Sequence, residues 1–185
     1  MQAAVKSELV SVVEYLAAEE ASQERHEYLG GLVYAMAGET GEHNQIAQNL
    51  LIQIRQKTKG GPYRAYISDI RVNFRLREDE YYYYPDIVVT CDKRDTHPRF
   101  VQHPKLIIEV LSESTERVDK REKFFPYVSI ESLQEYALVT QDGMEVTVFR
   151  RDKDWKAENV SGAKAVLKLE SLGVKIPLAS IYEGV

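Results

Sequence analysis

The stretch that decides the fold is a short apolar run that carries one acid, Pro104-Lys-Leu-Ile-Ile-Glu-Val-Leu-Ser112. A run of this length between a proline and a polar cluster is typical of a strand that is covered on both faces. Glu109 lies inside the run, and a carboxylate taken out of water without a partner costs several kcal/mol. Glu109 therefore needs a cation, a hydrogen-bond network or an opening to solvent.

A second acid stands at the mouth of another apolar strand, in Tyr84-Pro-Asp-Ile-Val-Val89. Two carboxylates at the ends of neighbouring strands, here Asp86 and Glu109, suit a hard divalent metal, which prefers oxygen ligands. A half-exposed face or an arginine partner would explain Glu109 equally well. These strands alone leave both interpretations open.

Composition bounds the class of protein. The chain has 185 residues, enough for a single domain over residues 1–185, and its 44% hydrophobic and 29% charged residues are ordinary for a soluble globular protein. The lone Cys91 excludes an intramolecular disulfide and a cysteine-based zinc cluster. No signal-peptide pattern and no membrane-length apolar run is present, so we expect a cytoplasmic protein without membrane association. The net charge of −5 argues against coating nucleic acid through bulk charge, but allows a locally basic groove.

Apolar periodicity predicts helices packed on a mixed sheet. Helices are expected over residues 7–21 and 38–59, the second with Thr40 as a possible N-cap, and a hairpin is expected around Gly30-Gly31. A third helix should follow residue 112, and antiparallel strands should occupy residues 135–176. We therefore predict an α/β (α+β) fold: a mixed β-sheet core flanked by helices, with an N-terminal helix and hairpin and a C-terminal antiparallel extension.

Several polar residues share faces with residues that should be buried. His43 continues the apolar stripe of Ile46, Ala47 and Leu50 one turn towards the N-terminus, so it is either functional or a satisfied core histidine. Asp119, Lys123 and Tyr127 recur at i, i+4 and i+8 and so lie on one helical stripe. A surface ion pair between Asp119 and Lys123 is the alternative for that stripe.

Residues 69–77 alternate between apolar and polar side chains and predict a half-exposed strand. Its polar face carries the strongest basic patch that we identify, either a nucleic-acid contact or a solvated face. The candidate functional residues on this face are Asp69, Arg71, Arg75 and Arg77.

The run Tyr81-Tyr-Tyr-Tyr84 follows directly. Four tyrosines could stack on bases, but cross-strand packing or a subunit interface is the better interpretation, because alternate residues of a strand point to opposite faces. We also expect self-association through exposed tyrosine-rich strands, with a homodimer as the expected assembly.

Taken together, these features resemble the PD-(D/E)XK nuclease superfamily and, more closely, the Uma-type family of bacterial candidate endonucleases. The resemblance runs from Glu27 in the hairpin through His43, Pro85-Asp86 and the Glu109 strand to Glu135-Tyr136, roughly residues 8–140. It implies a restriction-endonuclease-like core in which Asp86, Glu109 and the backbone carbonyl of Val110 bind Mg²⁺ or Mn²⁺.

The chain departs from the superfamily pattern where a lysine is expected two residues after the second acid, because Leu111 stands there. The hypothesis is that Lys123 supplies the amine from the following helix, with Asp119 orienting it and Tyr127 beside it. His43 would complete the metal shell or contact the phosphate, and Asp69 is a further, weaker candidate.

The resemblance implies a metal-dependent endonuclease, with DNA expected as the substrate more than RNA. A divalent ion suits this chemistry because it can activate water and neutralise charge on a phosphate. A catalytically degenerate nucleic-acid-binding or assembly module of the same fold is one alternative, which the missing lysine supports. An RNA-processing nuclease is another.

Overall fold

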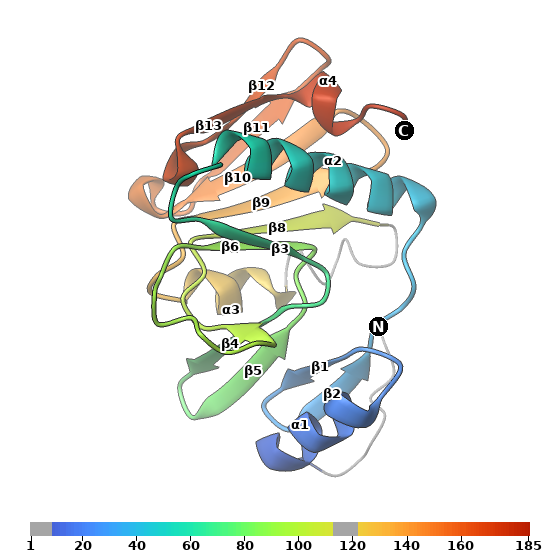
Figure 1. The fold of residues 1–185 in the computed structure, drawn as a ribbon, viewed down its shortest axis with the longest axis vertical. Coiled ribbons are helices and arrows are strands. Elements are labelled where there is room, and N and C mark those ends of the chain that lie inside the picture. Colours follow the sequence, from blue (N-terminus) through green and yellow to red (C-terminus); the bar gives the residue numbers. More distant parts are fainter. Residues whose placement is uncertain (1–8, 113–121) are drawn as a thin grey trace.

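A computed structural model describes residues 9–112 and 122–185 of the chain. Its main sheet has six strands in the order β11-β10-β9-β8-β6-β3 (Figure 1). The central strand β8 (Leu106–Leu111) is parallel to β9 and antiparallel to β6, and all its residues are buried, as its apolar run predicts. The other strands are β3 (Arg64–Ile67), β6 (Ile87–Thr90), β9 (Glu135–Thr140), β10 (Glu145–Arg150) and β11 (Ala157–Ser161).

The long helix α2 (Gly41–Lys57) lies along one face of this sheet. Thr40 is its N-cap, where the hydroxyl accepts a hydrogen bond from the His43 N–H, and the predicted stripe of Ile46, Ala47, Leu50 and Ile54 is buried. The C-terminal extension packs against the same core. Its elements are β12 (Val166–Leu169), η3 (Glu170–Leu172), β13 (Val174–Pro177) and α4 (Leu178–Ile181), while the short η2 (Arg151–Lys153) joins β10 to β11.

A second sheet, in the order β2-β1-β5-β4-β7, lies towards the opposite face, with α3 (Phe124–Val128) packed in the core between the sheets. Ile107 and Leu111 of β8 point into this core, so Glu109 between them faces it too. The predicted α+β architecture with a mixed sheet at its core is therefore confirmed, and the structure adds a second sheet to it. The strands are β1 (His26–Leu29), β2 (Leu32–Ala35), β4 (Arg71–Leu76), β5 (Asp79–Tyr83) and β7 (Phe100–Val101).

The N-terminal helix and hairpin form as predicted, with a later helix start. Helix α1 (Val12–Ala21) begins after Ser11, whose side chain forms a capping box with Glu14. Strands β1 and β2 pair through a two-residue turn in which Gly30 and Gly31 have φ of 54° and 100°. Such positive angles favour glycine. Within residues 9–112 and 122–185, no helix is long and apolar enough to cross a bilayer.

The tyrosine run is buried inside the chain. Tyr82, Tyr83 and Tyr84 are only 3%, 1% and 7% exposed, and Tyr82 packs against Tyr15 and Tyr28. Cross-strand and inter-element packing is therefore confirmed as their role. Three of the four tyrosines are thus not exposed as we expected, and Tyr81 is half-buried. Self-association as a homodimer stays a prediction.

Candidate active site

Asp86 and Glu109 meet at the end of the β6–β8 pair. Ile87 lies opposite Ile108, so continuing the antiparallel register by one residue sets Asp86 opposite Glu109. The Asp86 N–H donates to Glu109 Oε2 at 3.1 Å, and the Val110 N–H donates to Asp86 Oδ2 at 2.7 Å. Glu109 is 3% exposed, whereas the Asp86 side chain is 16% exposed. Solvent thus reaches this carboxylate pair from the Asp86 side.

Lys123 brings an amine to the same place. Its Nζ lies 3.5 Å from Glu109 Oε1 and 2.9 Å from Glu27 Oε1, and it also lies over the ring of Tyr83. Lys123 is the residue that precedes α3, so the short helix fixes its backbone against the second core. The convergence of Asp86, Glu109 and Lys123, which the sequence alone could not establish, is therefore present in the structure.

Tyr127 lies one turn further along α3 and completes the surroundings of Glu109. Its hydroxyl donates to Glu109 Oε1 at 3.1 Å, and the whole side chain is buried. Burial raises the pKa of Tyr127 well above its usual range, and the charges of Glu109 and Glu27 raise it further. The phenol is thus a permanent donor to the carboxylate.

His43 reaches Asp86 from α2, on the other face of the sheet. Its Nε2 lies 3.1 Å from Asp86 Oδ2 and 3.9 Å from Glu39 Oε2. Burial alone would lower the pKa of His43, but the hydrogen bond and charge of Asp86, the charge of Glu39 and a hydrogen bond to the Val110 backbone outweigh it. The net effect is a raised pKa, which favours a protonated imidazole beside Asp86.

Glu27 is the member of the cluster that sequence reasoning did not place in the site. It comes from β1, is 7% exposed, and accepts hydrogen bonds from both Lys123 Nζ and the Tyr84 N–H through Oε1. Its one signal in the sequence is an acid inside a short predicted strand next to Gly30-Gly31. Of the two described acids that pair with Lys123, Glu27 is the nearer, and it helps to set the position of the amine.

The donor set at this site fits a hard divalent cation. Asp86 and Glu109 offer carboxylate oxygens, and the backbone of Val110 lies against His43 and Asp86. In the described part of the chain no three His, Cys, Asp or Glu side chains form a metal-binding group by themselves. A bound ion would therefore complete its shell with the Val110 carbonyl and water.

The remaining predicted residues lie elsewhere. Asp69 is in the bend after β3, not on a strand face with the arginines; its side chain is 83% exposed and pairs with Arg25 at 3.3 Å. Asp119 lies outside the described residues, so its role stays a prediction.

The predicted arginine patch is not one surface. Arg71 is 5% exposed and its guanidinium lies among the rings of Tyr15, Tyr82 and Tyr84, so its expected place on a solvent-facing strand was wrong. The cause is a second layer, because α1 covers the face of β4 that alternation assigned to solvent. Arg75 and Arg77 are exposed, and Arg75 pairs with Glu80.

The chain is similar to known proteins over nearly its whole length. The model of a family named Uma2, with the description "Putative restriction endonuclease", matches residues 12–179. Two proteins of Synechocystis sp. (strain PCC 6803), both described as uncharacterized, are similar over nearly the whole chain. Protein slr1290 is 35% identical, covering 95% of this chain and 92% of its own; sll1609 is 30% identical, covering 94% and 100%.

The fold also matches a crystal structure from Anabaena variabilis, described as a putative nuclease belonging to DUF820. The TM-score is 0.78 at 20% sequence identity, and the match covers 94% of this chain and 98% of the other. At this identity the similarity concerns the fold, which is nuclease-like.

Proposed function

The chain belongs to the Uma2 family, and from this premise we propose that it is a metal-dependent endonuclease that hydrolyses phosphodiester bonds in DNA. The observation that carries the proposal is the meeting of Asp86, Glu109 and Lys123 at one partly solvent-accessible end of the β6–β8 pair. The two acids can hold a divalent ion for such a hydrolysis, and the amine can stabilise the charge that develops on the phosphate.

Each residue has a role that follows from its contacts. Asp86, Glu109 and the Val110 carbonyl would hold Mg²⁺ or Mn²⁺, which when bound activates water and neutralises charge on the phosphate. Lys123 orients the attacking water and stabilises developing negative charge. Leu111 is buried in the core between the sheets, so the amine has to come from another part of the chain, and Lys123 at the start of α3 provides it.

His43 and Tyr127 support the acids from two sides. A protonated His43 beside Asp86 is a hydrogen-bond donor that can also serve a phosphate oxygen. Tyr127 fixes the Glu109 carboxylate through one oxygen and leaves the other, Oε2, towards Asp86. Tyr127 is therefore a positioning residue in this proposal, whereas His43 would also contact the substrate phosphate.

The test is nicking of supercoiled plasmid in Mg²⁺ or Mn²⁺ by the wild type and by Asp86→Asn and Glu109→Gln. Removing either metal-binding charge should lower the nicking rate at least 100-fold, with the fold verified by circular dichroism. Asp152→Asn, an equal change at an exposed site, is the matched control and should keep the wild-type rate. Equal nicking by Asp86→Asn and the wild type would overturn the assignment.

One observation favours a second candidate, a nucleic-acid-binding or assembly module without catalysis. Both acids already accept hydrogen bonds from the protein, and a leucine stands at the usual lysine position. Duplex binding with no calorimetric Mn²⁺ binding and no cleavage would establish that module. Faster cleavage of an RNA of the same sequence than of the DNA would instead identify an RNA-processing nuclease.

A further inference from the structure

The C-terminal end of α2 leads into a basic segment without acids. Residues 43–68 contain no Asp or Glu, although the chain as a whole has 29 acidic residues and a net charge of −5. The same segment contains four basic residues besides His43, namely Arg55, Lys57, Lys59 and Arg64. Local positive charge therefore gathers here in an otherwise acidic protein.

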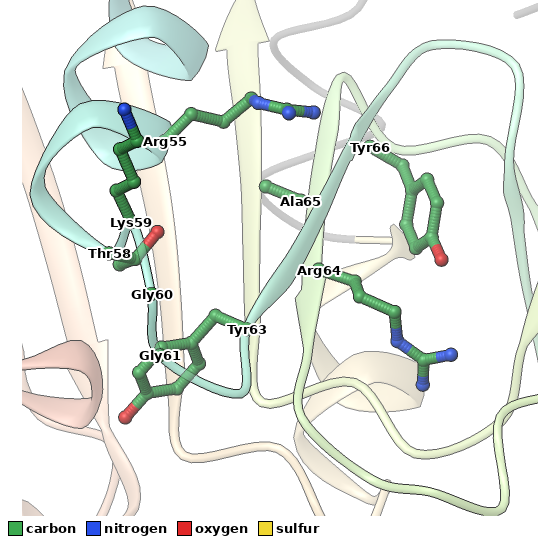
Figure 2. Close-up of a pocket in the computed structure, with 9 residues that line it drawn as sticks. All are labelled: Arg55, Thr58, Lys59, Gly60, Gly61, Tyr63, Arg64, Ala65 and Tyr66. Atoms are coloured by element: carbon green, nitrogen blue, oxygen red, sulfur yellow. The ribbon is translucent and has the colours of Figure 1, made fainter.

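Three of these basic residues, Arg55, Lys59 and Arg64, line a pocket. The last turn of α2, the turn at Gly60-Gly61 and strand β3 border a cavity of about 330 Å³ (Figure 2). Arg55 extends from the helix across the pocket towards β3, and Lys59 and Tyr63 border it from the turn. We call this cavity the basic pocket.

Two of the cations in the basic pocket have no acidic partner among the residues that the structure describes. Within the described ranges, 9–112 and 122–185, no carboxylate lies within ion-pair distance of Arg55 or Lys59, and both side chains are exposed. The helix macrodipole places only about half a negative charge at the C-terminus of α2, less than these two cations carry. The pocket keeps a positive excess that an anion can neutralise.

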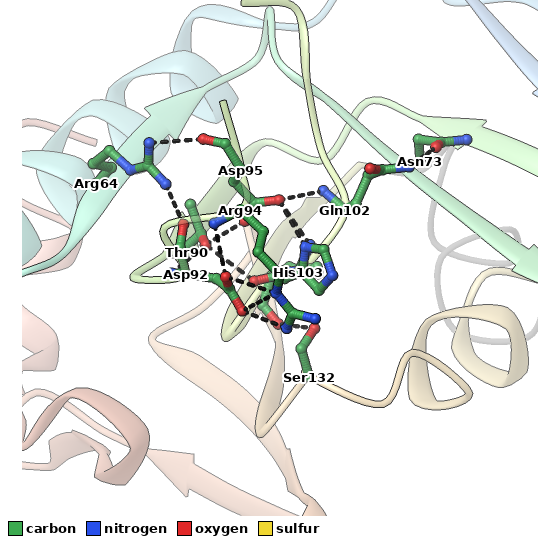
Figure 3. Close-up of polar contacts among 10 residues, drawn as sticks. Arg64, Asn73, Thr90, Asp92, Arg94, Asp95, Gln102, His103 and Ser132 are labelled. Atoms are coloured by element: carbon green, nitrogen blue, oxygen red, sulfur yellow. Dashed lines mark hydrogen bonds and ion pairs between the residues drawn. The ribbon is translucent and has the colours of Figure 1, made fainter. Parts of the chain in front are cut away.

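Arg64 has a different role at the rim. Its guanidinium donates to the backbone carbonyls of Asp92 and Asp95, at 2.6 and 2.8 Å (Figure 3). The Asp95 carboxylate in turn accepts from the Thr90 hydroxyl and from the backbone N–H groups of Gln102 and His103. Arg64 thus fixes the loop after β6 to β3, and the anion would be held by Arg55 and Lys59.

Strand β3 connects the basic pocket with the candidate active site. Arg64 lies opposite Thr90 and Ile67 opposite Ile87, and the Ser68 N–H donates to the Asp86 carbonyl at 3.0 Å. At about 3.3 Å per residue, the pocket end of β3 lies roughly 10 to 13 Å from the level of Asp86. The basic pocket and the candidate active site can therefore contact one DNA strand a few nucleotides apart.

We propose that the basic pocket binds the phosphate backbone of the DNA substrate a few nucleotides from the phosphate that reacts at Asp86 and Glu109. The inference rests on the proposed endonuclease function and names where the substrate strand runs. Unpaired arginine and lysine side chains neutralise phosphates whatever the base sequence, so this contact positions the duplex and does not read it.

The test measures binding apart from cleavage. Arg55→Glu/Lys59→Glu is compared with Lys153→Glu/Lys156→Glu, which makes the same charge change at two exposed lysines that already have acidic neighbours. Binding of a fluorescent 20-base-pair duplex is followed by anisotropy in Ca²⁺ at several salt concentrations. The pocket variant should bind at least tenfold more weakly, and its salt slope should fall by about two, roughly one per lost phosphate contact.

The other outcomes separate the two proposals. Equal affinities of the two double variants, whether both reduced or both unchanged, overturn the basic pocket but leave cleavage by the wild type to support the endonuclease. Weakened duplex binding by the pocket variant alone, with no cleavage by the wild type, supports the pocket and overturns the endonuclease. Inorganic phosphate that raises the melting temperature only when the pocket is intact, without duplex binding, would show a small-anion site and overturn the DNA assignment.

Discussion

Lys123 lies closer to Glu27 than to Glu109, with Nζ 2.9 Å from the first carboxylate and 3.5 Å from the second. The two acids come from different sheets, since Glu27 belongs to β1 and Glu109 to β8. One buried amine therefore bridges the N-terminal hairpin and the central strand. The hairpin is thereby part of the candidate site, and its loss should affect the site as well as the fold.

Lys123→Met should destabilise the protein, because it leaves two buried carboxylates without their cation. Breaking a buried ion pair by removing one partner costs about 3–5 kcal/mol. In Lys123→Met/Glu27→Gln one of the stranded charges is gone, so we expect part of that loss to be recovered. Urea unfolding measures both, with Lys153→Met as the exposed control at about 0–1 kcal/mol. A loss in Lys123→Met no larger than the control's would contradict the bridging role.

Local patterns predicted the elements that contain Asp86, Glu109 and His43 because each of these patterns is strong. A capping threonine and four buried apolar residues at helical spacing define α2, and a continuous apolar run defines β8. The helix stripe alone predicted that His43 faces the core. Glu27 could not be assigned in this way, since a four-residue strand carries little periodicity and its partner Lys123 is remote in sequence.

The alternation of apolar and polar residues in β4 predicted that Arg71 faces solvent, and this prediction was wrong for a physical reason. The pattern from Arg71 to Arg75 predicts one solvent-facing side only if nothing covers that side. Here α1 and the tyrosines of β1 and β5 cover it, and cation–π contacts with three rings replace water around Arg71. The burial of Arg71 is therefore set by the elements that pack on this face of β4, and the strand pattern holds no information about them.

Mn²⁺ should raise the melting temperature of the wild type in a concentration-dependent manner. A ligand that binds only the folded state stabilises it by about 2.7 kcal/mol when present at 100 times its dissociation constant. Asp86→Asn should lose this shift because it removes a carboxylate ligand, whereas Asp152→Asn should keep it. Scanning fluorimetry with and without EDTA measures the effect. The same shift in Asp86→Asn as in the wild type would place the ion elsewhere.

His43 should make stability depend on pH. Its folded-state pKa is raised above the ordinary value of 6.5, so the protonated imidazole stabilises the folded state. The contribution is fully present below about pH 6.5, where the unfolded chain is also protonated, and is lost as pH rises through the folded-state pKa. Urea unfolding of the wild type and His43→Gln in EDTA should show a difference that shrinks with rising pH. A difference that grows in that direction would mean the opposite linkage.

Arg71 should matter for stability and not for DNA binding. Its guanidinium lies 5.6 to 5.7 Å from the centroids of Tyr15, Tyr82 and Tyr84, and Nη1 is 3.5 Å from the Tyr15 hydroxyl. Each desolvated cation–π contact contributes up to about 2 kcal/mol, so we expect Arg71→Met to cost about 2–4 kcal/mol in urea unfolding. The exposed Arg75→Met should cost under about 1 kcal/mol. Duplex affinity of folded Arg71→Met should equal that of the wild type. Weakened duplex binding by a stable Arg71→Met variant would show that Arg71 contributes to the nucleic-acid interface.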